Sequence, residues 1–292
     1  MFKRLLICTD LTDGLQRLVH FIPSLAVNGI QQVTFLHAIP FPQRQTIPQI
    51  DESEAQAARD RLSIPPEAAG AVQVNVEVQG GKPIDCILNA AKVHQPDLLI
   101  LGTSSQGALS DRFFGSTVSE LSKRAIAPLL IVRPQLLSTY TIEELDLRCR
   151  HLFRYLLIPF DGSKASDYTI EQVKELAQNQ PSGSLQQCLL YWVIGEGKYT
   201  ELLESGSSQA TRKKLELVQT ELQAVGLQVS SEISQGEPVP QTLNAAIEED
   251  ISAIVCSSGS FGTLMEWSVP SFASEILKRS WHPVLYFPPK RG

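Results

Sequence analysis

A glycine- and hydroxyl-rich segment in the first half of the chain has the residue types of a phosphate-binding loop. It begins as Gly102-Thr103-Ser104-Ser105-Gln106-Gly107 and ends as Gly115-Ser116-Thr117, directly before a segment with helical spacing. Glycines let the backbone approach an anion closely, and free N–H groups at a helix start bind phosphate oxygens. These residue types are therefore compatible with a phosphate site. Taken alone, however, the loop favours the structural explanation, a capping box between Thr117 and Glu120 with Gly102 and Gly107 as turn residues.

The half of the chain that contains this loop is repeated, but the loop itself is not. Residues 114–124 return in similar form as residues 269–279, so that Pro270 stands at the position of Gly115. In the second copy, the positions that would meet phosphate carry Ser257, Ser260, Pro270 and Ser271. Because proline has no N–H and fixes φ, we expect the second half to keep the fold and to bind no triphosphate in the same way.

The composition is that of an ordinary globular protein. The chain has 292 residues, of which 43% are hydrophobic and 19% charged, and its net charge is −6. These values exclude a disordered chain and argue against a nucleic-acid surface. No apolar run is long enough to span a membrane, so we expect a cytoplasmic protein. The five cysteines form no Cys-x-x-Cys pair and the five histidines are scattered, so we predict neither a metal site nor a redox role.

Short apolar runs alternate with segments of helical spacing in both halves. The runs of the first half are 5–9, 33–39, 72–78, 98–101 and 129–132, and helical spacing is found at 15–25, 53–62, 84–93 and 117–125. Pro23 must kink or end the first of these helices. The alternation predicts an α/β fold with an open parallel sheet in each half. Ligands of such sheets lie beyond the strand ends where the strand order reverses, so the loops after the first and fourth strands are the candidates.

The glycine loop resembles a family signature. Gly102-Thr103-Ser104-Ser105, followed after nine residues by Gly115-Ser116, is similar to the ATP-binding signature of universal stress proteins, which is Gly-x-x-Gly, nine residues, then Gly-Ser or Gly-Thr. Ser105 stands where the family has its second glycine. Both halves also have the family's aspartate after the first strand and its Gly-x-Pro before the third helix. The resemblance implies two tandem Rossmann-like domains, 1–136 and 151–290, joined by a linker at 137–150.

The resemblance also implies a ligand and the residues that bind it. ATP, accompanied by Mg²⁺, would bind in the first domain alone. The nucleoside would contact Thr9, Asp10 and Ala38, and the phosphates would contact Gly102, Ser105, Gly115, Ser116 and Thr117. A role of Asp10 as a helix N-cap is the alternative. The family further implies self-association, with the two halves paired through their last strands as a pseudo-dimer and a homodimer as a further form.

The sequence contains no motif for catalysis. It lacks a Gly-x-Ser-x-Gly nucleophile elbow and a Walker lysine motif. We therefore predict a non-catalytic stress-response regulator that binds an adenine nucleotide in its first half. Two alternatives remain open. One is a scaffold that has lost the nucleotide and acts through protein contacts; the other is a slow ATPase, for which no general base can be named.

Overall fold

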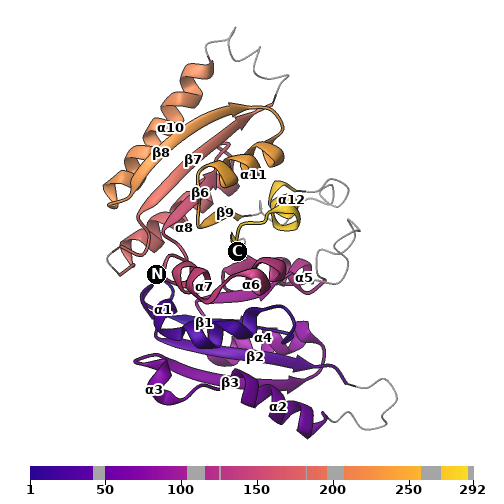
Figure 1. The fold of residues 1–292 in the computed structure, drawn as a ribbon. Coiled ribbons are helices and arrows are strands. Elements are labelled where there is room, and N and C mark those ends of the chain that lie inside the picture. The colour runs from indigo at the N-terminus through magenta and orange to yellow at the C-terminus, as the bar shows by residue number, and fades with distance from the viewer. Residues whose placement is uncertain are drawn as a thin grey trace. The chain divides into compact units, whose positions relative to one another are not determined.

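The structure is a computed structural model that describes residues 1–41, 50–103, 116–124, 126–181, 183–195, 207–257 and 271–288. The chain divides into two compact units (Figure 1). One consists of Phe2–Arg150, and the other of His151–Gly292 together with Met1. Each unit is a parallel sheet flanked by helices, which confirms the predicted α/β class.

The sheet of the first unit reverses its strand order beside β1. Its described strands are β1 (Arg4–Cys8), β2 (Gln32–Ile39), β3 (Gln73–Gly80), β4 (Leu98–Gly102) and β5 (Leu129–Val132), and they lie in the order β3-β2-β1-β4-β5. All these pairs are parallel. The apolar side chains of β1 are buried, as expected of a strand covered on both faces. The chain thus leaves β1 in one direction to β2 and returns on its other side as β4.

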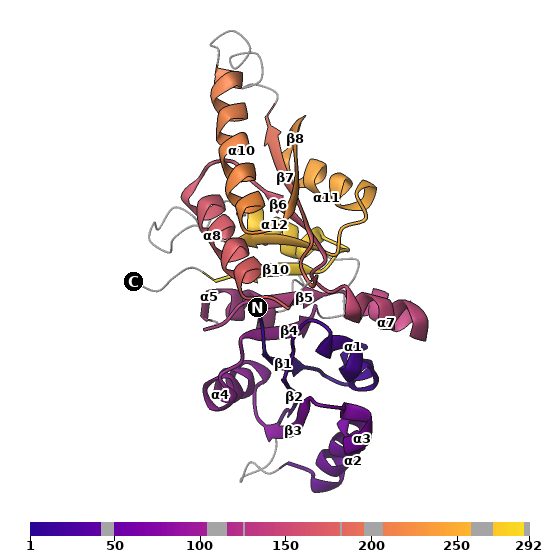
Figure 2. The ribbon, with the colours of Figure 1, turned by 90° about the vertical axis from the view of Figure 1, so that its left-hand side faces the viewer.

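Helices cover both faces of this sheet. They are the 3-10 helix η1 (Leu15–Phe21), α1 (Ile22–Ala26), α2 (Glu52–Leu62), α3 (Pro66–Ala69), α4 (Pro83–His94), α5 (Ser116–Arg124), α6 (Pro134–Thr139) and α7 (Ile142–Arg150). Figure 2 shows α4 on one face and α1, α2 and α3 on the other. η1 ends at Phe21, and Pro23 lies in the first turn of α1. Proline is tolerated there because the N–H groups of a first helical turn have no partner within the helix.

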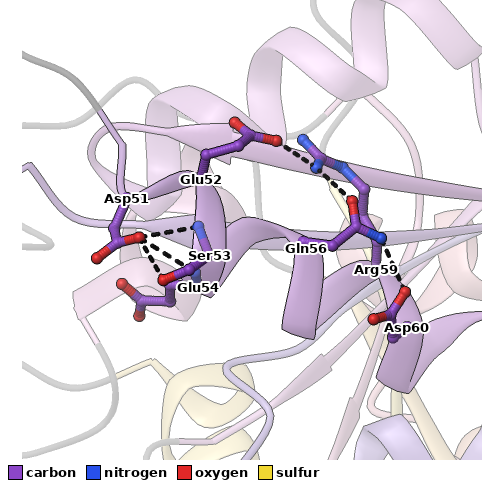
Figure 3. Close-up of polar contacts among 7 residues, drawn as sticks. All are labelled: Asp51, Glu52, Ser53, Glu54, Gln56, Arg59 and Asp60. Atoms are coloured by element: carbon purple, nitrogen blue, oxygen red, sulfur yellow. Dashed lines mark hydrogen bonds and ion pairs between the residues drawn. The ribbon is translucent and has the colours of Figure 1, made fainter.

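The α2 helix shows how local chemistry sets an element boundary (Figure 3). The Asp51 carboxylate accepts hydrogen bonds from the backbone N–H groups of Ser53 at 2.8 Å and Glu54 at 3.4 Å, and from the Ser53 hydroxyl at 2.6 Å. These bonds satisfy donors that the first helical turn leaves unpaired. The hydroxyl and N–H of Ser53 lower the pKa of Asp51. Seven residues into the helix, Arg59 pairs with Glu52 at 2.6 Å.

The segment 137–150, expected to be a linker, folds with the first unit. It forms the end of α6 and all of α7, and α7 packs against α1. Leu145 and Cys149 are buried there. The Asn28 side chain donates to the Cys149 carbonyl oxygen at 2.8 Å, and Ser24 donates to Asp146. The segment is therefore held by apolar burial and by hydrogen bonds from Ser24 of α1 and from Asn28, which follows α1.

The second unit repeats this topology. Its described strands are β6 (Tyr155–Pro159), β7 (Gln187–Ile194), β8 (Gln228–Gln235), β9 (Ala253–Ser257) and β10 (Val284–Phe287), in the order β10-β9-β6-β7-β8. Its helices are α8 (Lys164–Gln178), α10 (Ser207–Ala224), α11 (Pro238–Glu248) and α12 (Phe272–Arg279). In Figure 2, α8 and α10 lie on one face of this sheet and α11 on the other. The sheet reverses its order beside β6, at the position equivalent to β1.

Candidate functional site

The candidate site of the first unit lies where β1 and β4 end side by side. Cys8 at the end of β1 is paired in register with Leu101 of β4. Thr9 and Asp10 follow directly after β1, and Gly102 is the last residue of β4. Ala38 lies near the end of β2, which pairs with β1 on its other side. The structure therefore brings these four predicted residues to one edge of the sheet, at the reversal of strand order.

The remaining predicted residues belong to the glycine loop and to the start of α5. Ser105 and Gly115 lie outside the described residues. Ser116 is the first residue of α5, and Thr117 is half-buried in its first turn. The phosphate half of the predicted site is thus represented in the structure by Gly102 and the beginning of α5.

Thr9 is engaged in bonds within the protein. It is 5% exposed, its hydroxyl donates to Asp13 Oδ1 at 2.7 Å, and Thr9 Oγ1 itself accepts the N–H of Leu11 at 2.9 Å. The Thr9 carbonyl oxygen lies 2.9 Å from Nδ1 of His37. A carbonyl can only accept, so the proton sits on Nδ1 in this contact. Thr9 thereby ties the end of β1 to β2 and to the turn that follows.

Asp10 is exposed and stabilises a turn. Its Oδ1 accepts the N–H and the hydroxyl of Thr12, both at 2.8 Å. The following helix η1 begins at Leu15, and its cap residue is Gly14, which contributes no side-chain hydrogen bond. The alternative of Asp10 as a helix N-cap is therefore wrong: the residue caps a local turn instead. Its carboxylate faces solvent at the carboxyl edge of the sheet.

Asp13 is a member of this site that the sequence motifs did not reveal. It is 7% exposed, and its Oδ1 accepts the Leu15 N–H at 3.0 Å as well as the Thr9 hydroxyl. Burial raises the pKa of Asp13, although the hydrogen bond from Thr9 opposes the shift. The signal available in the sequence was a second aspartate three residues after Asp10 and next to a glycine. That pattern does not reveal which of the two carboxyl groups turns inward.

Gly102 is closely packed by its neighbours. A Cβ atom built on Gly102 would lie 3.2 Å from both Cβ and Oδ2 of Asp13, and 3.3 Å from Cγ of Pro134. The absence of a side chain at Gly102 therefore serves the packing of Asp13 and Pro134. This is a structural reason for the glycine that is independent of any ligand.

Arg133 brings a positive charge to the same edge. It follows β5, and its Nη1 donates to Oγ1 of Thr103 at 3.4 Å. Burial lowers the pKa of Arg133, yet a guanidinium group remains charged in proteins. Arg133 was not among the predicted site residues, because it follows the last strand rather than the first or fourth.

The equivalent edge of the second unit uses its serines internally. The Ser257 hydroxyl donates to the Ala165 carbonyl oxygen at 2.8 Å and accepts from Thr169 at 3.1 Å. The Ser271 hydroxyl caps α12 by accepting the Ser274 N–H at 3.2 Å. Ser260 and Pro270 lie outside the described residues. The hydroxyl groups of Ser257 and Ser271 are thus occupied by structural bonds.

Metal-binding and redox chemistry find no support in the described part of the chain. Within those ranges, no group of three histidine, cysteine or acidic side chains is placed to hold a metal ion. All five cysteines are buried thiols, and burial raises the pKa of Cys149, Cys188 and Cys256 to about 12. Thiols of that kind are poor nucleophiles and poor ligands at neutral pH.

No described helix has both the length and the apolar character needed to cross a membrane.

Comparison with known proteins identifies the family. The profile of the Universal stress protein family matches residues 1–133 and 153–288. A relative in Thermus aquaticus, the "Universal stress protein in QAH/OAS sulfhydrylase 3'region", is 27% identical over 137 residues, which are 46% of this chain and 100% of the relative.

Two solved structures share the fold over nearly the whole chain. A universal stress protein from Archaeoglobus fulgidus DSM 4304 has a TM-score of 0.67 at 18% identity, and the similarity covers 97% of each chain. A functionally unknown protein from Pseudomonas aeruginosa PAO1 has a TM-score of 0.63 at 13% identity, covering 99% of this chain and 93% of its own. With one family match in each unit, the chain belongs to the universal stress protein family as a tandem two-domain member.

Proposed function

We propose that this protein is a non-catalytic, cytoplasmic stress-response regulator that binds an adenine nucleotide such as ATP at the carboxyl edge of its first unit. The observation that carries the proposal is the adjacency of the ends of β1 and β4 at the reversal of strand order, which brings Asp10 and Gly102 to one edge of the sheet. Arg133 follows β5, the next strand beyond β4, at the same edge. Open α/β sheets bind their ligands at this position.

The chemistry of these residues suits the parts of a nucleotide. The exposed Asp10 carboxylate can accept hydrogen bonds from ribose hydroxyls, and Ala38 near the end of β2 is a small, partly exposed residue against which a base could lie. Arg133 and the first N–H groups of α5 supply positive potential for phosphates. Ser105, Gly115, Ser116 and Thr117 stay predictions as phosphate donors. Mg²⁺ would be held chiefly by the phosphates and water, as is usual for this ion.

The acidic residues at this edge favour binding over catalysis. Asp13 is buried and bonded to Thr9, and Asp10 is committed to the turn at Thr12. A general base needs a carboxylate within reach of the attacking water and free to take its proton. Asp13 does not meet that requirement, and Asp10 is assigned to the ribose hydroxyls, so no described aspartate of this turn is left to activate water and we propose binding without hydrolysis.

Calorimetric titration of the full chain with ATP tests this function. We expect Asp10→Ala to weaken ATP binding about tenfold, the value of a lost charge-assisted hydrogen bond. Gly115→Pro, which copies the residue at the equivalent position of the second half, should remove the part of the ATP affinity that comes from contacts with the phosphates. Asp161→Ala is the matched control, because Asp161 occupies the position of Asp10 in the second unit. Unchanged ATP affinity in both Asp10→Ala and Gly115→Pro would show that the site is elsewhere.

A nucleotide-free scaffold is the second candidate, and the packing around Gly102 favours it. Asp13 and Pro134 occupy the space beside Gly102, and an ionised Asp13 would repel phosphate there. If the unmodified protein binds no ATP in the same titration, the fold serves protein contacts alone. Hydrolysis of ATP by the purified protein would contradict both candidates, and a rate that Asp10→Ala lowers would place that activity at the edge of the first unit.

A further inference from the structure

The second unit contains a cavity at the edge of its sheet that corresponds to the candidate site of the first. Its volume is about 240 Å³, and it lies among the carboxyl ends of β6, β7 and β9, with α11 and the first turn of α12 beside it. An apolar cavity of about 150 Å³ is enough to admit benzene. The cavity of the second unit is therefore large enough for one ring or two fused rings.

The walls of this cavity are largely apolar. They include the aromatic side chains of Phe160, Tyr191 and Phe272, and the smaller side chains of Val193 and Cys256. Phe160 and Tyr191 are 2% and 4% exposed, so their rings are held within the core. Walls of this kind bind ligands by burying apolar surface and by aromatic stacking.

Most of the hydroxyl groups in the lining already have partners. Thr169 donates to Ser257, Ser257 donates to the Ala165 carbonyl oxygen, and Ser166 donates to the Ser163 carbonyl oxygen at 2.9 Å. The two bonds of Ser257 connect α8 to the end of β9, and the Ser166 bond lies within the first turn of α8. Such hydroxyls are structural and contribute little further hydrogen bonding to a ligand.

Thr242 differs from these hydroxyls. It lies on α11, lines the cavity and is 0% exposed. Its Oγ1 is buried and has no hydrogen-bond partner among the residues that the structure describes. A buried hydroxyl without a partner costs free energy, and most buried polar groups in proteins are paired. Because Thr242 is fully buried, a small shift of the cavity wall would bring its hydroxyl to a ligand that supplies one donor or acceptor, and this contact would complete the bonding of Thr242.

The charges around the cavity disfavour phosphate. Within the described lining, the only charged side chain is Asp161, which is exposed at the rim. Burial opposes its ionisation, but hydrogen bonds from the Ser163 hydroxyl and N–H outweigh that effect and lower the pKa of Asp161. Lys214 is not a lining residue, but its Nζ lies 5.5 Å from the centroid of the Phe160 ring, where it donates to the Gly162 carbonyl oxygen at 2.9 Å and lies 3.7 Å from Asp167. An anionic ligand would thus meet the Asp161 carboxylate in the described lining, whereas the nearby Lys214 ammonium is already engaged by Gly162 and Asp167.

We propose that the cavity of the second unit binds a small uncharged aromatic molecule with one hydrogen-bonding group, recognised by the Phe160, Tyr191 and Phe272 rings and by the Thr242 hydroxyl. This site is separate from the nucleotide site proposed for the first unit and needs no phosphate. The second unit has therefore changed its ligand class rather than become an inert copy.

Titration with indole, an uncharged fused ring with one N–H donor, tests the proposal. Calorimetry on the full chain should give one indole per chain in the second unit. We expect Thr242→Val, which keeps the shape of the side chain and removes the hydroxyl, to weaken binding about 2- to 10-fold. The same variant should not lower the melting temperature, because it removes an unpaired buried hydroxyl. Ala273→Leu, which fills the cavity from α12, should abolish binding.

Thr220→Val is the matched control for the hydroxyl. Thr220 is exposed on α10, where its hydroxyl donates to the Glu216 carbonyl oxygen at 2.7 Å, and its loss should leave indole affinity unchanged. Absence of indole binding, or equal affinity in the wild type and Thr242→Val, would overturn the proposal. A second measurement uses a chain that carries Gly115→Pro and so lacks the phosphate contacts proposed for the first unit. If this chain still binds ATP and Ala273→Leu weakens that binding, a charged nucleotide occupies the cavity and the proposal is overturned.

Discussion

The hydroxyl of Thr9 donates a 2.7 Å hydrogen bond to the carboxyl group of Asp13, and this contact closes the turn after β1. Both residues are buried at the edge of the sheet where the ligands of this fold class lie. The exposed partner in the same turn is Asp10. The turn thus separates two aspartates into one that holds the protein together and one that faces solvent.

The buried state of Asp13 predicts a specific pH dependence. Because burial raises its pKa in the folded protein, the stability that it contributes is fully present below the unfolded value of 3.8 and is lost as pH rises toward the folded pKa. Asp13→Asn resembles the protonated form. We therefore expect its stability relative to the wild type to improve as pH rises from about 4 to 7, measured by urea unfolding.

The control for Asp13 is an exposed carboxylate of the same unit. Asp60 lies on the surface of α2, and Asp60→Asn should give a difference from the wild type that does not follow this trend. If the difference in free energy of unfolding between Asp13→Asn and the wild type stays constant across this pH range, burial does not raise the pKa of Asp13.

The close packing at Gly102 predicts a cost for any side chain there. Gly102→Ala places a Cβ 3.2 Å from Asp13 and 3.3 Å from Pro134, so we expect it to destabilise the protein by about 1–3 kcal/mol. Gly195→Ala is the control, because among the described residues, its chain neighbours aside, no atom lies within 4 Å of the added Cβ. Denaturant unfolding of both variants would decide the matter, and equal stability of the two would refute the packing role of Gly102.

Substitution of the buried Leu145 tests whether the packing of α7 stabilises the first unit. Leu145 is 1% exposed, whereas Leu147 on the same helix is 55% exposed. We expect Leu145→Ala to cost about 2–5 kcal/mol of stability and Leu147→Ala no more than about 0.5 kcal/mol. If thermal unfolding shows similar small effects for both, the segment 137–150 acts as a simple connector.

The cap of α2 predicts a local rather than a global effect. Asp51→Ala removes the acceptor for the N–H groups of Ser53 and Glu54, so their amide hydrogens should exchange faster with solvent (Figure 3). Glu54→Ala removes a charge from the same turn without removing that acceptor, and should leave the Ser53 amide protected.

The same contact has a pH signature. Because the pKa of Asp51 is lowered in the folded state, its contribution is present above the unfolded value of 3.8 and is lost as pH falls through the folded pKa. The exchange difference between Asp51→Ala and the wild type should therefore disappear at low pH. A difference that persists in strong acid would contradict the cap.

Much of the fold follows from local patterns. The apolar runs at 5–9, 98–101 and 129–132 correspond to β1, β4 and β5, because strands buried on both faces need apolar side chains at every position. The predicted helix broken at Pro23 appears as η1 followed by α1. The repeat of these patterns predicted two units of one topology. The α7 helix could not be assigned to the first unit from the sequence, because only its tertiary contact with α1 distinguishes it from a polar connector.

Residue types and spacing were enough to predict the repeated α/β topology, the family and the edge of the sheet where Thr9, Asp10 and Gly102 meet. Which aspartate is buried became clear only in the folded chain, because the direction of a side chain in a turn depends on what packs against it. The cavity of the second unit likewise appears only after folding. The glycine losses in that half indicated a lost phosphate site, but the cavity walls come from strands far apart in the chain, whose side chains meet only in the tertiary structure.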